Sequence, residues 1–324
     1  MPREIPREGA FAYNRTVAAQ LEPPALTTRL RLSIAYDGTD FTGWAKQPGI
    51  RTVQGELEAA LATVFRRFGP PPILAVAGRT DAGVHATGQV AHLDLTAAQL
   101  AHLAVPHGRG AKAQEPTLAL AKRLNGIAGL KSDVYVARVS VAPPGFDARF
   151  SPIFRRYEYR IADASARRDP LLRHHTLWYP AALDLDAMNT AAGQLLGLHD
   201  WAAYCRPREG ATTIRELQEF HWHRDETGVL IARLQADAFC HSMVRALVGS
   251  VVSVGETKLL GDRLLGIRNE AQRTSEFKVM SAAGLTLTEV GYPDDAEVGA
   301  RAEQTRARRG VEGDGGLTTA RSTA

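Results

Sequence analysis

Alternating hydrophobic and polar positions open the patterned part of the chain. Over residues 30–36 an apolar side chain stands at every second position, and a turn-forming Asp-Gly pair follows at residues 37–38. This period of two predicts a half-buried strand. After Thr52 the spacing changes: apolar residues recur every third or fourth position over residues 53–68, before Gly69 and three prolines. That pattern predicts a helix capped by Thr52.

Two consecutive units share this order of elements. The first unit is completed by predicted strands at about residues 73–77, 89–95 and 134–141, and by a helix near residues 118–124. The second has predicted strands at about residues 154–161, 213–221, 229–236 and 285–291, with helices over residues 184–197, 242–254 and 262–269. Apart from the last helix, each unit runs strand–helix–strand–strand–helix–strand.

The repeated order predicts an α+β fold with two tandem ferredoxin-like halves. We expect a wide antiparallel sheet with helices on one face and a central cleft. The predicted divisions are a flexible N-terminal arm (residues 1–27), a first half (28–150), a second half (151–293) and a disordered tail (294–324). Within the first half, residues 102–115 contain proline and glycine and are expected to form a surface insertion.

Composition narrows the class of protein. Of the 324 residues, 44% are hydrophobic and 23% charged, which is typical of a soluble globular protein. No apolar run is long enough for a membrane span, so no membrane association is expected. The two cysteines, Cys205 and Cys240, lack metal-type spacing and predict separate buried thiols in a reducing cytoplasm. A formal charge of +4 permits a polyanionic partner without identifying one.

The segment GRTDAGVHA at residues 78–86 concentrates reactive side chains between two predicted strands. Its glycines allow the backbone to approach a ligand, and Arg79 favours the charged form of Asp81, as a nucleophile requires. An aspartate that only holds its own turn is the alternative, and from residue chemistry alone it is the better one.

Two other segments carry side chains suited to RNA. Arg155, Tyr157 and Tyr159 share one face of a predicted strand, which suits base stacking, although paired aromatics on a strand are more often part of a core. Arg245 lies in the first turn of a predicted helix, where the macrodipole disfavours a cation. A functional partner is one explanation and an ordinary surface arginine is the other. For His241, an RNA contact and a helix-cap role are both open.

Together these segments resemble the tRNA pseudouridine synthase A family. The resemblance is carried by four motifs in order: YDGTDFTGWAKQPGIRTVQGELEAAL (residues 36–61), GRTDAGVHATGQV (78–90), FDARFSPIFRRYEYRI (146–161) and AFCHSMVRALVGSVVSVG (238–255). A GLTL segment at residues 284–287 closes the match, which spans about residues 28–293.

The resemblance implies roles for four residues. Asp81 corresponds to the catalytic nucleophile, and Tyr157 to the tyrosine that contacts the target uracil. Arg79 would fill the space left by a flipped-out base and pair with phosphate, and Arg245 would form an ion pair with Asp81. No cofactor and no metal are implied.

The implied reaction is isomerisation of uridine to pseudouridine at positions 38, 39 and 40 in the anticodon stem-loop of tRNA, by a homodimer. A non-catalytic RNA-binding or tRNA-folding protein on the same scaffold is the alternative. A metal-dependent nuclease would need clustered carboxylates, whereas the segment at residues 78–86 has one acidic residue, Asp81, near a basic residue, Arg79.

Overall fold

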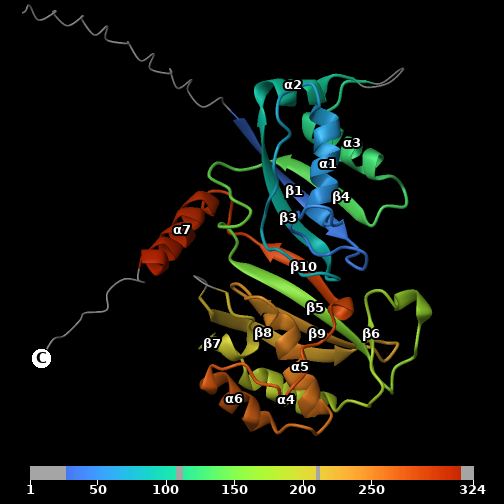
Figure 1. Cartoon of the computed structure of the whole chain (residues 1–324), viewed down its shortest axis with the longest axis vertical. Helices are drawn as coiled ribbons and strands as arrows, with labels where there is room; N and C mark the ends of the chain where they lie inside the picture. Colours follow the sequence, from blue (N-terminus) through green and yellow to red (C-terminus); the bar gives the residue numbers. More distant parts are fainter. Residues whose placement is uncertain (1–26, 107–111, 209–211, 315–324) are drawn as a thin grey trace, which may run out of the picture.

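The structure is a computed structural model that describes residues 27–106, 112–208 and 212–314 (Figure 1). Ten strands form one sheet in the order β4-β1-β3-β10-β5-β9-β8-β7, with β2 beside β3 and β6 beside β5. The first half contains β1 (Thr27–Tyr36), α1 (Val53–Phe65), β2 (Ala75–Val76), β3 (His85–Thr96), α2 (Ala97–Ala104), α3 (Pro116–Ala128) and β4 (Val134–Val141). The second half begins with β5 (Phe154–Ala162), η1 (Pro170–Leu172), β6 (Leu177–Trp178), α4 (Leu185–Gln194), β7 (Gly197–Asp200), η2 (Ala202–Tyr204) and β8 (Ile214–Arg224). It continues with β9 (Leu230–Ala236), α5 (Met243–Gly255), α6 (Gly261–Glu270), η3 (Ala282–Gly284) and β10 (Leu285–Gly291), and α7 (Val298–Asp314) follows it.

The predicted α+β fold class is confirmed. Strands β4, β1, β3 and β2 form the ferredoxin-like order of the first half, and β10, β5, β9 and β8 repeat it in the second. Neighbouring strands within these sets are antiparallel. The halves join through β3 and β10, which run parallel, as do β5 and β6, so the sheet differs there from the antiparallel expectation. At the junction a Cβ on Gly88 would overlap the Thr288 carbonyl, so only glycine permits this approach.

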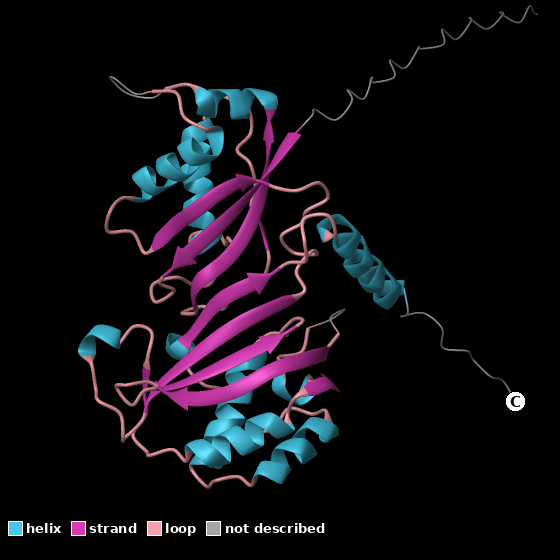
Figure 2. Cartoon of the chain, turned by 180° about the vertical axis from the view of Figure 1, so that it is seen from behind, coloured by secondary structure: helices cyan, strands magenta, loops and turns pink. Residues whose placement is uncertain are grey.

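Helices α1, α3, α4 and α5 cover one face of the sheet (Figures 1 and 2). Thr52 caps α1 by accepting a hydrogen bond from the Gly55 N–H at 3.2 Å, as predicted. Each half has its own apolar core, built around Leu30, Trp44 and Phe65 in the first and around Tyr159 and Trp201 in the second. The first core is built mainly from residues 30–148 and the second from residues 159–285, and β10 contributes to both. The division near residue 150 stays a prediction.

Part of the predicted surface insertion is helical. Helix α2 precedes it and ends inside it, and Leu103 is buried. Thr96 and Gln99 form a capping box: the Thr96 hydroxyl accepts from the Gln99 N–H, and the Gln99 amide accepts from the Thr96 N–H. For residues 102–104 the prediction was wrong, because the capping box at Thr96 starts a helix that continues to Ala104. Residues 107–111 lie outside the described part.

The predicted disordered tail contains helix α7, so the prediction was wrong over this stretch. Val298 and Ala302 are buried, and the Ser151 hydroxyl donates to the Val298 carbonyl at 2.8 Å. Arg306 pairs with Asp147 at 2.6 Å. The helix therefore packs on the loop between β4 and β5, apart from the other helices (Figure 2). The predicted N-terminal arm lies outside the described residues except for Thr27, which begins β1.

Cys205 and Cys240 are joined in a disulfide, with Cα atoms 5.7 Å apart. The expectation of two separate thiols was therefore wrong. They lie 35 positions apart in the sequence, and the chain between them includes β8 and β9, which form an antiparallel hairpin and return the chain to its starting point. Among the helices that the structure describes, none is long and apolar enough to cross a membrane.

Candidate active site

The loop that carries Asp81 joins β2 to β3 and is held by the segment that follows β1. The Trp44 N–H donates to the Thr80 carbonyl at 3.0 Å, and the Thr80 hydroxyl lies 2.8 Å from the Tyr36 hydroxyl. Gln89 donates to that tyrosine at 3.2 Å. Tyr36 and Trp44, which hold the loop, are both buried. The loop is therefore fixed in place, while the side chain of Asp81 is 34% exposed.

Two cationic or ionisable residues of the second half face the Asp81 carboxylate. Arg245 Nη1, from the first turn of α5, lies 4.0 Å from Asp81 Oδ2, as the sequence resemblance implied. His241 Nε2, just before the same helix, lies 3.4 Å from Oδ1. Arg245 Nε is buried and has no hydrogen-bond partner among the described residues. The carboxylate thus sits at the junction of the halves, with its oxygens facing different side chains.

Tyr157 lies at the same junction, on the helix-covered face of β5. Its ring packs against both apolar cores and meets Phe239 edge-on, with ring centres 5.2 Å apart. Burial above all, together with nearby Tyr36 and Asp81, raises the pKa of Tyr157, so its hydroxyl is protonated at neutral pH. Tyr159 on the same face is fully buried and donates to the Ser281 carbonyl at 2.7 Å. Tyr159 is therefore a core residue.

Arg79 is exposed and forms no hydrogen bond or ion pair with any residue in the described part of the chain. It is therefore not the partner of Asp81, a role the sequence left open for it. Its guanidinium remains available to a ligand beside the Asp81 loop.

Arg155 has a role that the sequence analysis missed. Its guanidinium donates to the carbonyls of Asp237 at 2.7 Å, Ala77 at 3.2 Å and Arg149 at 3.4 Å. Ala77 precedes the Asp81 loop, and Asp237 precedes the segment that carries His241. Arg155 thus ties together the two halves of the site, whereas its place beside the tyrosines had suggested base stacking.

His85 fastens the far end of the Asp81 loop. Its Nδ1 accepts the Gly38 N–H at 3.0 Å, and its Nε2 lies 3.2 Å from the Ala283 carbonyl. Burial lowers the pKa of His85, so the ring is neutral and can donate from Nε2. The side chain therefore links β3, the turn after β1 and η3.

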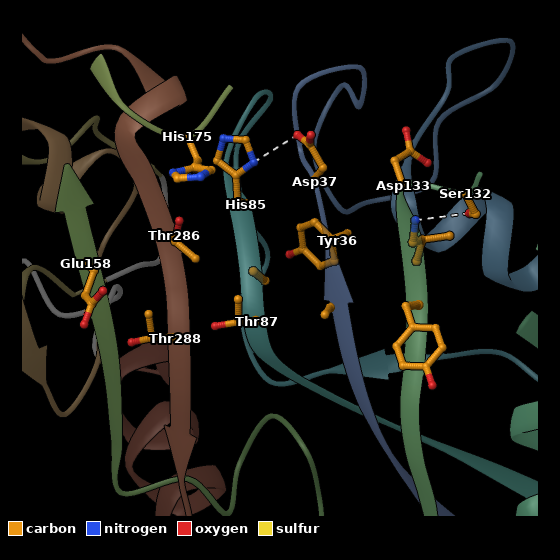
Figure 3. A pocket seen from close by; sticks show the side chains of 14 residues that line it. Tyr36, Asp37, His85, Thr87, Ser132, Asp133, Glu158, His175, Thr286 and Thr288 are labelled. Atoms are coloured by element: carbon orange, nitrogen blue, oxygen red, sulfur yellow. Dashed lines mark hydrogen bonds and ion pairs between the residues drawn. The ribbon is translucent and has the colours of Figure 1, made fainter. Parts of the chain in front are cut away.

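A hollow of about 520 Å³ spans the junction on the opposite face of the sheet (Figure 3). Asp37 and His85 line it from the first half, and Glu158 and Thr286 from the second. Glu158 stands between the inward-facing tyrosines of β5, which places the hollow on the uncovered face. The residues lining it do not include Asp81, Tyr157 or Arg245. The expected central cleft is therefore not at this hollow.

The described residues contain no group of three or more His, Cys, Asp or Glu side chains placed to hold a metal ion. The immediate neighbours of Asp81 are instead Arg245 and His241.

The fold and these motifs define a pseudouridine synthase, and comparison with known proteins supports this class. Residues 191–293 match the family model described as tRNA pseudouridine synthase. A tRNA pseudouridine synthase A from Leifsonia xyli subsp. xyli is 64% identical over 285 residues, covering 87% of this chain and 98% of the relative. One from Streptomyces griseus subsp. griseus is 50% identical over 288 residues, covering 89% and 96%.

The chain belongs to the tRNA pseudouridine synthase A family and is an isomerase. Among solved structures, a chain of the archaeal box H/ACA sRNP Nop10–Cbf5 complex is 9% identical with a TM-score of 0.29, covering 87% of this chain and 57% of that one. Such a distant likeness adds nothing to the assignment, which rests on the close relatives.

Proposed function

We propose that this enzyme isomerises uridine to pseudouridine at positions 38, 39 and 40 in the anticodon stem-loop of tRNA, with Asp81 as the nucleophile. One observation supports this most directly. The Asp81 carboxylate is partly exposed at the junction of the halves and faces Arg245 from across it. Tyr157 lies close enough for the Asp81 charge to influence its pKa.

The reaction needs no redox partner, because its product is an isomer of its substrate. The bond between uracil N1 and ribose C1′ breaks, the base turns, and C5 bonds to C1′. C5 loses a proton and N1 gains one. Asp81 acts at the ribose, either by attack on C1′ or through a glycal-type intermediate. Tyr157 contacts the uracil with its ring and protonated hydroxyl.

A stacked uridine must leave the helix before it reaches Asp81, and flipping it costs a few kcal/mol. Arg79 is exposed beside Asp81 and has no protein partner in the described region. In our proposal its guanidinium occupies the space of the flipped base and pairs with phosphate. Arg206, whose N–H donates to the His241 carbonyl, and Arg208 are both exposed. They add positive charge for phosphate contacts, which position RNA without selecting its sequence.

Family membership supports two further proposals. The enzyme acts as a homodimer, and it works in the cytoplasm, where tRNA is matured.

The substitution Asp81→Asn tests the proposal, since it keeps the side-chain shape and removes the negative charge that makes the carboxylate a nucleophile. We expect pseudouridine formation in tRNA to fall below detection while tRNA binding changes by less than about threefold. Arg79→Gln is the matched comparison and should weaken turnover without abolishing it. A variant that converts uridine at the wild-type rate would contradict the nucleophile assignment. Wild-type protein that binds tRNA but makes no pseudouridine would instead favour the non-catalytic alternative.

A further inference from the structure

His241 and Arg245, both at the start of α5, face the Asp81 carboxylate together. His241 Nε2 lies 3.4 Å from Oδ1, while Arg245 Nη1 lies 4.0 Å from Oδ2. The two contacts therefore address different oxygens of one carboxylate. A carboxylate held by one oxygen only is free to rotate about its last bond, whereas contacts at both oxygens define the plane of the group.

The backbone around His241 is held in an unusual conformation. Ser242 has a φ of 66°, in the left-handed region, and is one of three non-glycine residues with positive φ among those the structure describes. This conformation is unfavourable for a residue that carries a Cβ. The His241 carbonyl accepts the Arg206 N–H at 2.9 Å, and Cys240 is joined to Cys205. Three constraints thus fix the segment that aims His241 at Asp81.

Stability does not account for this arrangement. The His241 side chain is 44% exposed and lies outside both apolar cores, so its burial adds little to folding. Strained backbone that persists beside a reactive group is typical of functional sites. The Asp81 carboxylate from the β2–β3 loop faces the imidazole, and the same carboxylate faces the Arg245 guanidinium from α5.

We propose that His241 is a positioning residue for the nucleophile: through Oδ1 it sets the orientation in which Asp81 meets the ribose. This inference rests on the proposed function of Asp81. It assigns His241 to the chemical step and away from the RNA-contact and helix-cap roles that the sequence left open. Ser242 has a part in it as well, because its left-handed turn directs the histidine.

The test separates chemistry from binding. Single-turnover pseudouridine formation and tRNA dissociation constants are measured for wild type, His241→Ala and His241→Gln. A small misplacement of a reacting group can cost up to about 100-fold in rate. We expect His241→Ala to lose roughly 10-fold or more in rate at saturating enzyme, with the dissociation constant unchanged within about twofold. His241→Gln keeps an N–H donor and should recover part of the loss. His223→Ala, an exposed histidine on β8, is the control and should match wild type.

A second set of three variants leaves the imidazole in place. Ser242→Ala removes the hydroxyl and keeps the backbone strain, whereas Ser242→Gly relieves the strain. Because both variants keep the left-handed turn, both should retain the wild-type rate. Ser242→Val disfavours the left-handed turn and should slow the chemical step as His241→Ala does, provided the protein remains folded by circular dichroism. Equal rates in Ser242→Val and wild type would overturn the role of the turn.

The remaining outcomes are distinct. A weaker dissociation constant with an unchanged saturating rate would make His241 an RNA contact and overturn the inference. If the wild type is active and His241→Ala has the same rate, the inference is also overturned, and the proposed function stands. A wild type without activity would overturn the proposed function and the inference together.

Discussion

Side chains at the junction divide into those that touch both halves and those that belong to one. Tyr157 packs against both cores, whereas Tyr159, two residues further on, packs within the second. Period-two alternation in the sequence placed the two tyrosines on one face, and the family resemblance selected Tyr157. The contacts of Arg155 and His241 were not predictable in this way. The contacts of Arg155 depend on three backbone carbonyls that the fold brings together around its guanidinium. The contact of His241 depends on the left-handed turn at Ser242.

Replacing Tyr157 by phenylalanine separates its ring from its hydroxyl. The ring still fills the junction, so we expect the melting temperature to change by less than about 2 °C. Loss of the protonated hydroxyl should reduce single-turnover pseudouridine formation by roughly tenfold or more, in the range typical of a positioned polar group. The measurements are turnover of a tRNA substrate and thermal unfolding of the same preparation.

Tyr159→Phe is the matched control. It removes the hydrogen bond to the Ser281 carbonyl and should cost about 1 kcal/mol of unfolding free energy, with a smaller effect on rate. If Tyr157→Phe turned over tRNA like wild type, Tyr157 would be a core residue and its place in the site would have to be withdrawn.

Elements with a strong hydrophobic period were predicted well, and elements fixed by contacts elsewhere in the chain were not. β4 was predicted with its observed bounds and α5 to within one residue, because each carries a regular apolar pattern. Helix α7 has a polar sequence with a narrow buried side, so composition alone suggested disorder. Its docking depends on the loop between β4 and β5, which no local pattern in α7 reveals. The Cys205–Cys240 pairing was not predicted either, because the fold of the chain between the two cysteines brings them together and no local pattern around either one shows it.

Ala302→Asp tests whether α7 is docked. Ala302 is fully buried, so an aspartate there would place a charge in an apolar contact, and we expect the helix to detach. The unfolding free energy should fall by roughly 1–3 kcal/mol, and residues 298–314 should become sensitive to protease. Glu303→Gln, at the exposed neighbouring position, should leave both measurements unchanged. Equal protease resistance in Ala302→Asp and wild type would contradict the packing described for this helix.

On the scale of the whole molecule, the repeated order of elements was enough to predict two ferredoxin-like halves and their shared sheet. The manner of their joining was not predictable, since the parallel pairing of β3 with β10 depends on the close approach at Gly88. The hollow on the uncovered face also includes His175, from the long connection between β5 and β6. Alternation tells which residues share a face, but it does not tell which distant loop crosses that face.

Two buried histidines tie distant parts of the molecule together and make its stability depend on pH. His85 and His92 each accept a backbone N–H at Nδ1, from Gly38 and Ala148, both at 3.0 Å. Burial lowers the pKa of both rings. The folded state therefore binds fewer protons than the unfolded chain, where a histidine has a pKa of about 6.5. This contribution to stability is fully present above pH 6.5 and is lost as the pH falls below it.

We expect the melting temperature to fall between pH 7 and pH 5, with each histidine contributing at most about 1.4 kcal/mol per pH unit. The carboxyl groups whose pKa lies below the ordinary 3.8, such as Asp94 and Asp147, stay ionised in this interval and do not contribute to the slope. His92→Gln should flatten the dependence, whereas His223→Ala, exposed on β8, should leave it unchanged. A melting temperature that rises on acidification to pH 5 would mean that the buried rings gain a proton on folding, against the contacts of Nδ1 in this structure.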